Sequence, residues 1–156
     1  MKKILTLGIC FMTLLLMTGC GSKIAIIEGN LEDLMTDVYE GIEEENLPMM
    51  LGNIELDEEN KTSYIGEAEF EYKEAIASES GVGSIAHSVV LIRMNDNVTE
   101  EEIEVAVKEL KDNVNPRKWL CVGVEEVQVE SNGNLILVVL NDDLGDTLVE
   151  NFKKIN

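Results

Sequence analysis

The chain has 156 residues, which is enough for one domain with a substantial apolar core. It carries 31 acidic and 12 basic residues, for a net charge of −19 at pH 7. This charge excludes nucleic-acid binding, because neutralising phosphates requires Lys and Arg. Three interpretations of the acidity stay open: solvation of the surface, recruitment of divalent cations, or recognition of a cationic partner.

The N-terminal segment has the pattern of a secretory signal peptide. Lys2 and Lys3 precede an uncharged apolar run over residues 4–17. This run is shorter than the roughly 20 residues that a membrane-spanning helix needs. Met17-Thr18-Gly19-Cys20 closes it, with small residues directly before the cysteine.

This tetrapeptide resembles the lipobox of bacterial lipoproteins, with Met17 where Leu is usual. The resemblance implies cleavage before Cys20 and attachment of a diacylglycerol to its thiol. Two or more acyl chains hold a protein stably on a bilayer. We therefore expect a lipid-anchored protein on the extracytoplasmic face of the cell membrane. A plain secretory signal and an uncleaved anchor helix are the alternatives.

We divide the chain into a signal peptide (1–19), a short tether (20–29) and a single α+β domain (30–156). Removal of Lys2 and Lys3 with the signal peptide lowers the net charge from −19 to −21. Anionic lipid headgroups should repel such a domain, so the membrane affinity must come from the lipid. Cys121 has no partner for a disulfide, and its apolar neighbours predict a buried thiol.

The pattern of the first part of the domain predicts a helix. Asn30 is a good N-cap, and the apolar positions after it repeat with the spacing of one helix face: Leu31, Leu34, Met35, Val38 and Ile42. Glu43–Glu45 and Pro48 should end this helix. A second short helix, capped by Asp57, is expected within residues 56–66.

From residue 70 the pattern alternates between strands and helices. We expect strands over residues 70–76, 84–94, 120–130 and 135–140. Thr99 and Glu102 form a capping box for a helix that ends before Pro116. Asn132-Gly133 predicts a hairpin turn, and Asp142 or Asp143 should start a last helix.

This order predicts an α+β fold: a two-layer sandwich with a mostly antiparallel sheet of about four strands and helices on one face. The tight hairpin lets strand 135–140 insert between strands 84–94 and 120–130, antiparallel to both. That arrangement is a split βαβ unit.

No motif in the sequence predicts a catalytic site, a metal site or a cofactor. His87 is the only histidine, and its apolar surroundings favour a buried sheet residue. Residues 81–86 resemble only a fragment of a phosphate-binding loop, and a strand follows them where such loops need a helix. The Asn and Asp clusters at 95–97 and 141–146 precede helices, where they serve as caps, and they lack the ligand spacing of a calcium loop.

The candidate interaction patch is Arg117, Lys118 and Trp119, which combines the only tryptophan with two basic residues on a loop. The alternative is that Trp119 seals one end of the sheet while the basic side chains interact with a helix C-terminus.

The domain also resembles uncharacterised small lipoproteins of Bacillota type, around residues 84–88 and 115–119, and this resemblance implies no activity. Our leading hypothesis is a non-enzymatic binding or accessory module that is anchored through Cys20 and has an unknown envelope protein or ligand as its partner. The alternatives are a divalent-cation-binding surface protein and a carboxylate-dependent hydrolase acting on cell-envelope material.

Overall fold

A computed structural model describes residues 24–156, so the expected signal peptide and Cys20 lie outside the described residues. The domain contains one open five-stranded sheet in the order β1-β2-β3-β5-β4, and every neighbouring pair is antiparallel. The strands are β1 (Leu51–Glu55), β2 (Glu74–Ser80), β3 (Ser88–Arg93), β4 (Gln128–Asn132) and β5 (Leu135–Leu140). The helices are α1 (Leu31–Val38), the short 3-10 helix η1 (Glu44–Asn46), α2 (Thr62–Ile65), α3 (Glu100–Asn113) and α4 (Gly145–Phe152).

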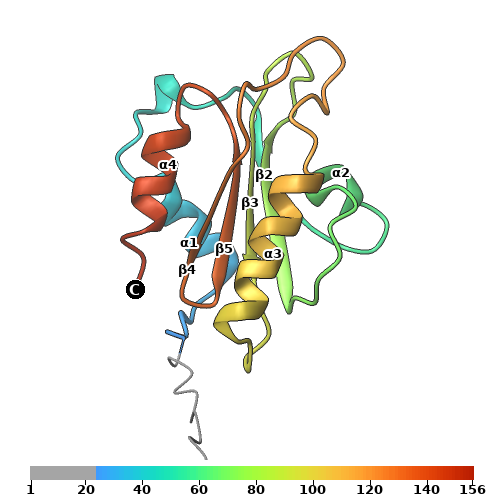
Figure 1. The fold of residues 1–156 in the computed structure, drawn as a ribbon. Helices are drawn as coiled ribbons and strands as arrows, with labels where there is room; N and C mark the ends of the chain where they lie inside the picture. Colours follow the sequence, from blue (N-terminus) through green and yellow to red (C-terminus); the bar gives the residue numbers. More distant parts are fainter. Residues whose placement is uncertain (1–23) are drawn as a thin grey trace, which may run out of the picture.

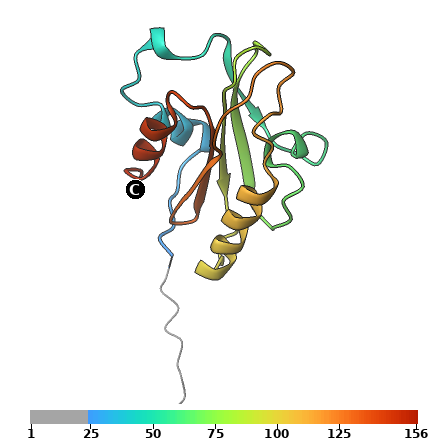
Figure 2. The ribbon, with the colours of Figure 1, turned by 45° about the horizontal axis from the view of Figure 1, so that its top comes forward.

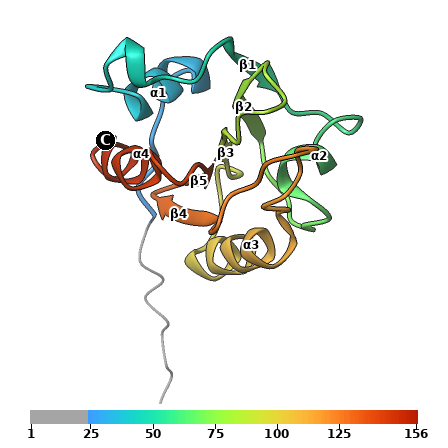
Figure 3. The same cartoon turned by 90° about the horizontal axis from the view of Figure 1, so that it is seen from above.

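Helices cover both faces of this sheet (Figure 1). Every residue of β3 and β5 is buried, and successive side chains alternate between two separate apolar clusters. Helices α1 and α4 pack on one cluster, whereas α3 and the short α2 pack on the other. The view along the strands shows the resulting layers (Figure 3).

The expected fold class, α+β with a mostly antiparallel sheet, is therefore confirmed. The expectation of two layers with helices on one face was wrong. Strands that are apolar on both sides need cover on both sides, and the uninterrupted apolar runs 89–92 and 135–140 already carried that signal.

The split βαβ unit is present as expected. Strand β5 lies between β3 and β4 and is antiparallel to both, and α3 connects β3 to β4 along the chain. Gly133 forms the hairpin turn with φ +55°, a conformation that favours glycine. Strand β4 begins only at Gln128, however, because residues 120–127 form an irregular loop instead of a strand.

The sequence did not predict β1, which raises the number of strands from about four to five. Gly52 and Asn53 disfavour strands, and four of the five residues of β1 are exposed. The expected strand over residues 70–76 is instead β2, which starts at Glu74 and extends to Ser80.

Two of the four expected helix starts are confirmed, those at Asn30 and Thr99, whereas α2 starts after Lys61 rather than at Asp57. The Asn30 side chain accepts a hydrogen bond from the backbone N–H of Glu32 at 2.7 Å, and the capping box of Thr99 and Glu102 is formed. Helix α1 ends at Val38 rather than beyond Ile42. Helix α4 follows Leu144 and has no side-chain cap, so the expected start at Asp142 or Asp143 was wrong; Asn141 Oδ1 accepts from the backbone N–H of Leu144 at 2.6 Å in the turn that leads into the helix.

Within residues 24–156, no helix is both long enough and apolar enough to cross a membrane.

Candidate functional site

The sequence-predicted patch lies on the loop between α3 and β4, at the end of the domain opposite residue 24 (Figure 1). Arg117 is exposed, whereas Lys118 and Trp119 are partly buried and turn toward β2. Lys118 Nζ lies 2.9 Å from Glu79 Oε2, and Trp119 Nε1 donates to Glu79 Oε1 at 3.1 Å. The structure thus brings two of the three residues together around a carboxylate that sequence reasoning missed.

This Lys118–Glu79 pair is a largely internal contact. The Lys118 side chain is 14 % exposed and the Glu79 side chain is 15 % exposed. Burial lowers the pKa of Lys118, and the nearby Glu79 carboxylate opposes that shift. The ammonium also lies 4.0 Å from the centre of the Tyr64 ring. The positive charge of Lys118 is therefore compensated within the domain by Glu79 and Tyr64. Arg117 is the member of the patch that is exposed to solvent.

Strand β1 lies next to this cluster and forms one free edge of the sheet. Two backbone bonds define which of its groups face β2: Gly81 N–H donates to Met50 C=O at 3.0 Å, and Leu56 N–H donates to Ala75 C=O at 2.9 Å. Because hydrogen-bonded pairs alternate in an antiparallel ladder, Gly52 and Ile54 also bond to β2. The backbone N–H and C=O groups of Leu51, Asn53 and Glu55 consequently point away from the sheet.

A hollow flanks β1 on each face of the sheet. The hollow on the α1 side, of about 290 Å³, is lined by Met35, Tyr39, Leu47 and Leu51 among others. The hollow on the α2 side, of about 420 Å³, is lined by Met50, Ile54, Tyr64 and the Lys118–Glu79 pair among others. Gly52 has no heavy atom within 4 Å of where a Cβ would lie, so the α2-side hollow is open beside it.

The single histidine is structural in this arrangement. His87 is fully buried, as expected, and its ring nitrogens contact Tyr39 Oη at 2.7 Å and Asn141 Nδ2 at 3.0 Å. Burial lowers the pKa of His87 to about 4 and raises that of Tyr39. A neutral imidazole held between two neutral partners fixes the wall of the α1-side hollow and has no carboxylate to orient it for proton transfer.

A third depression, of about 520 Å³, lies between the start of α3, the end of β3 and the segment before β2. No lysine or arginine lines it. Its lining consists of apolar residues, acidic residues and two asparagines: Glu69, Phe70, Glu71, Met94, Asn95, Asn97, Val98, Glu101, Glu102 and Val105. This lining suits a ligand with a positive charge beside an apolar part. Over residues 24–156, no three His, Cys, Asp or Glu side chains converge in a way that could hold a metal ion.

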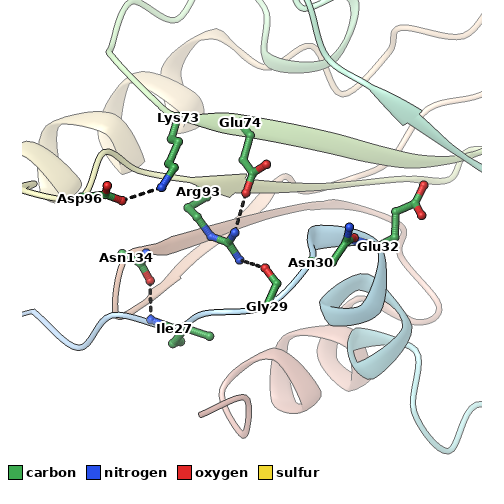
Figure 4. Close-up of polar contacts among 9 residues, drawn as sticks. All are labelled: Ile27, Gly29, Asn30, Glu32, Lys73, Glu74, Arg93, Asp96 and Asn134. Atoms are coloured by element: carbon green, nitrogen blue, oxygen red, sulfur yellow. Dashed lines mark hydrogen bonds and ion pairs between the residues drawn. The ribbon is translucent and has the colours of Figure 1, made fainter.

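The base of the domain fixes the chain that leads toward the expected anchor (Figure 4). The Arg93 side chain is 10 % exposed, pairs with Glu74, and donates from Nη2 to the Gly29 carbonyl at 2.8 Å. The side-chain Oδ1 of Asn134 accepts a hydrogen bond from the backbone N–H of Ile27 at 2.8 Å, and the backbone N–H of Asn134 donates to the Ala25 carbonyl at 3.0 Å. Residues 24–29 of the expected tether are therefore packed against the domain.

Cys121 is exposed, which corrects the expectation of a buried thiol. The apolar run 120–122 lies in the irregular loop, and Leu120 next to the cysteine is 96 % exposed. An apolar run of this length looks the same in a strand and in a loop, so the local sequence carried no signal for the difference.

Comparison of the chain with protein-family models, with curated proteins and with solved structures finds no match.

Proposed function

We propose that the protein is a lipid-anchored binding module, cleaved before Cys20 and held on the extracytoplasmic face of the cell membrane by lipid on that residue. The sequence of residues 1–20 supports the anchor. The observation that supports the module is the fixed base, because Arg93 and Asn134 hold residues 25–29 against the domain.

This base sets the spacing between lipid and domain. Only residues 21–23 lie between Cys20 and the first described residue, Ile24, and the four steps from 20 to 24 span roughly 13 Å when extended, at about 3.3 Å per residue. An anchor at Cys20 would hold the base of the domain close to the bilayer. The acidic surface adds no attraction to anionic lipid, so all of the membrane affinity is assigned to the acyl chains.

The surface of the domain supports binding rather than chemistry. Its described residues offer an open strand edge with a hollow on each face, whereas the histidine is neutral and enclosed. Recognition by a strand edge needs only backbone groups and shallow hollows, and β1 supplies both.

Labelling with radioactive palmitate in a bacterial host tests the anchor. We expect label on the wild-type protein and on Cys10→Ser, and none on Cys20→Ser, because only Cys20 occupies the lipobox position. Protease added to intact spheroplasts should digest the wild-type domain. Label on Cys20→Ser, or protection from the protease, would contradict the proposal.

A further inference from the structure

The free edge of β1 carries unused hydrogen-bonding groups. The outward C=O of Glu55 accepts from Asn60 Nδ2 at 2.9 Å, which closes that end of the edge. In the part of the chain that the structure describes, the outward N–H and C=O groups of Leu51 and Asn53 have no intramolecular partner. Natural sheets protect such edges with lysine, proline, a bulge or a covering segment. Strand β1 has neither lysine nor proline, and the view along the strands shows no segment over its outer side (Figure 3).

The side chains around the edge fit an added strand. Successive side chains of an extended peptide point to opposite faces of a sheet, and a hollow is present on each face beside β1. Met49 and Met50 are 69 % and 73 % exposed directly before the strand, and Ile54 is 39 % exposed within it. Apolar side chains of an incoming strand would therefore find apolar contacts on both faces.

The charge around β1 identifies the kind of strand. Residues 43–61 contain seven carboxylates and one lysine: Glu43, Glu44, Glu45, Glu55, Asp57, Glu58, Glu59 and Lys61. All seven acidic residues are exposed, and Lys61 pairs with Glu58 at 2.8 Å. Like charges oppose pairing of β1 with a second copy of this acidic chain, whereas a basic segment would be attracted to both ends of the edge.

We propose that the free edge of β1 takes up an extended, basic segment of a partner protein as an additional strand of the sheet. The N–H and C=O groups of Leu51 and Asn53 bond to its main chain. Side chains that point to opposite faces of the added strand enter the two hollows, one beside Tyr39 and the other beside Tyr64, and its basic ends meet the acidic segments on either side of β1. This inference rests on the proposed role as a binding module, but not on the anchor.

A synthetic probe tests the proposal with the full-length protein in detergent. The probe is a fluorescein-labelled nine-residue peptide with a Val-Thr-Val-Thr-Val centre between two pairs of lysines. One control peptide has proline in place of the central Val and keeps the charge. A second control has glutamate in place of each lysine. Binding is measured by fluorescence anisotropy at physiological salt.

Each control separates pairing from simple charge attraction. We expect the proline peptide to bind about tenfold more weakly than the probe, because proline lacks the N–H donor of the central residue and its ring disturbs the neighbouring pairing. We expect the glutamate peptide to bind more weakly for a different reason, because the acidic segments beside β1 repel its carboxylates. The protein variant Asn53→Pro should lose a similar factor because it removes an outward N–H, and Asn53→Ala should bind like the wild type. Equal binding of the probe and its proline version would overturn the proposal, as would no binding up to millimolar probe, because main-chain pairing tolerates different side chains.

Hydrogen exchange of the wild-type protein covers the case in which Asn53→Pro does not fold. Bound probe should slow exchange at the amides of Leu51 and Asn53, and unchanged exchange there with probe bound would overturn the proposal. Dimerisation through β1 in place of probe binding would also overturn it. Peptide binding is measured in detergent, so failed palmitate labelling would leave this inference intact, and failed peptide binding would leave the anchor intact.

Discussion

The two edges of the sheet are built in opposite ways. At the β4 edge, Asn132 Nδ2 donates to the carbonyls of Phe152 at 3.0 Å and Ile155 at 2.9 Å, which ties the strand to the end of α4. The turn that follows holds the N-terminal segment through Asn134. At the β1 edge, the one comparable contact is that of Asn60 with Glu55. Figure 2 shows β1 on the side of the sheet away from β4, with the short helix α2 beside it.

Closure of an edge in this sheet therefore depends on a few side-chain amides and one glycine. Both edges belong to the same sheet, and both carry polar, partly exposed strands. The tied edge organises the chain near the expected anchor, whereas the open edge keeps its backbone groups available. Substitutions at matched positions on the two edges should therefore have unequal effects.

The largest difference is expected between Gly133→Ala and Gly52→Ala. Gly133 has φ +55°, and an added Cβ would lie 2.4 Å from the Ala25 carbonyl oxygen. This change should lower the free energy of unfolding by about 2–3 kcal/mol. Gly52 has open space around its Cβ position, so its replacement should change stability by less than about 0.5 kcal/mol. Urea unfolding of both variants measures the difference, and equal losses would contradict the account.

A smaller difference is expected between Asn132→Ala and Asn53→Ala. The first change leaves two partly buried carbonyls without their donor and should cost about 1–2 kcal/mol. The second removes an exposed side chain and should leave stability unchanged within about 0.5 kcal/mol. Thermal melts read by circular dichroism would show this, and a neutral Asn132→Ala would mean that the β4 edge is not held by its amide.

Acidification should act near the open edge, through His87. Its pKa is about 4 in the folded protein against 6.5 for the free side chain, so the unfolded state binds more protons between these values. The contribution of His87 to stability is full above pH 6.5 and is lost as the pH falls through this window, by at most about 1.4 kcal/mol per pH unit. The ring proton resonances of the single histidine report its titration by NMR. A midpoint near 6.5 would contradict the burial of the ring between Tyr39 and Asn141.

The smallest effect is expected from calcium. The acidic residues that border β1 are exposed and do not converge in the described residues, so millimolar calcium should shift the melting temperature no more than the same concentration of magnesium. Calcium present at 100 times the Kd of a specific site would add about 2.7 kcal/mol to the free energy of unfolding. A saturable shift of that size would favour the divalent-cation alternative over a protein partner.

Local signals in the sequence predicted much of the fold. Asn30, the pair Thr99 and Glu102, and Asn132-Gly133 each act through neighbouring backbone groups, so their spacing alone located two helix starts and the hairpin. The order of elements then predicted the position of β5 between β3 and β4. The cover on both faces was also readable from the uninterrupted apolar strands, although a two-layer fold was expected.

The candidate site was less accessible to sequence reasoning. Strand β1 has an exposed surface and a Gly-Asn centre, so it lacks the apolar alternation that marks a strand. Glu79 lies 39 residues from Lys118 along the chain and 40 from Trp119, and nothing local links them. The patch at Arg117, Lys118 and Trp119 was singled out for its composition, yet the role of two of its members became visible only through that distant carboxylate.

Hydrogen exchange of the free and probe-bound protein, read by NMR at single amides, tests the contrast between the two edges most directly. The outward amides of β1, at Leu51 and Asn53, should exchange rapidly in the free protein and slow when the basic probe is bound, while the β4 amides stay unchanged. Slow exchange at Leu51 and Asn53 in the free protein would contradict the open edge at β1, and slowing at β4 instead of β1 would contradict strand addition there.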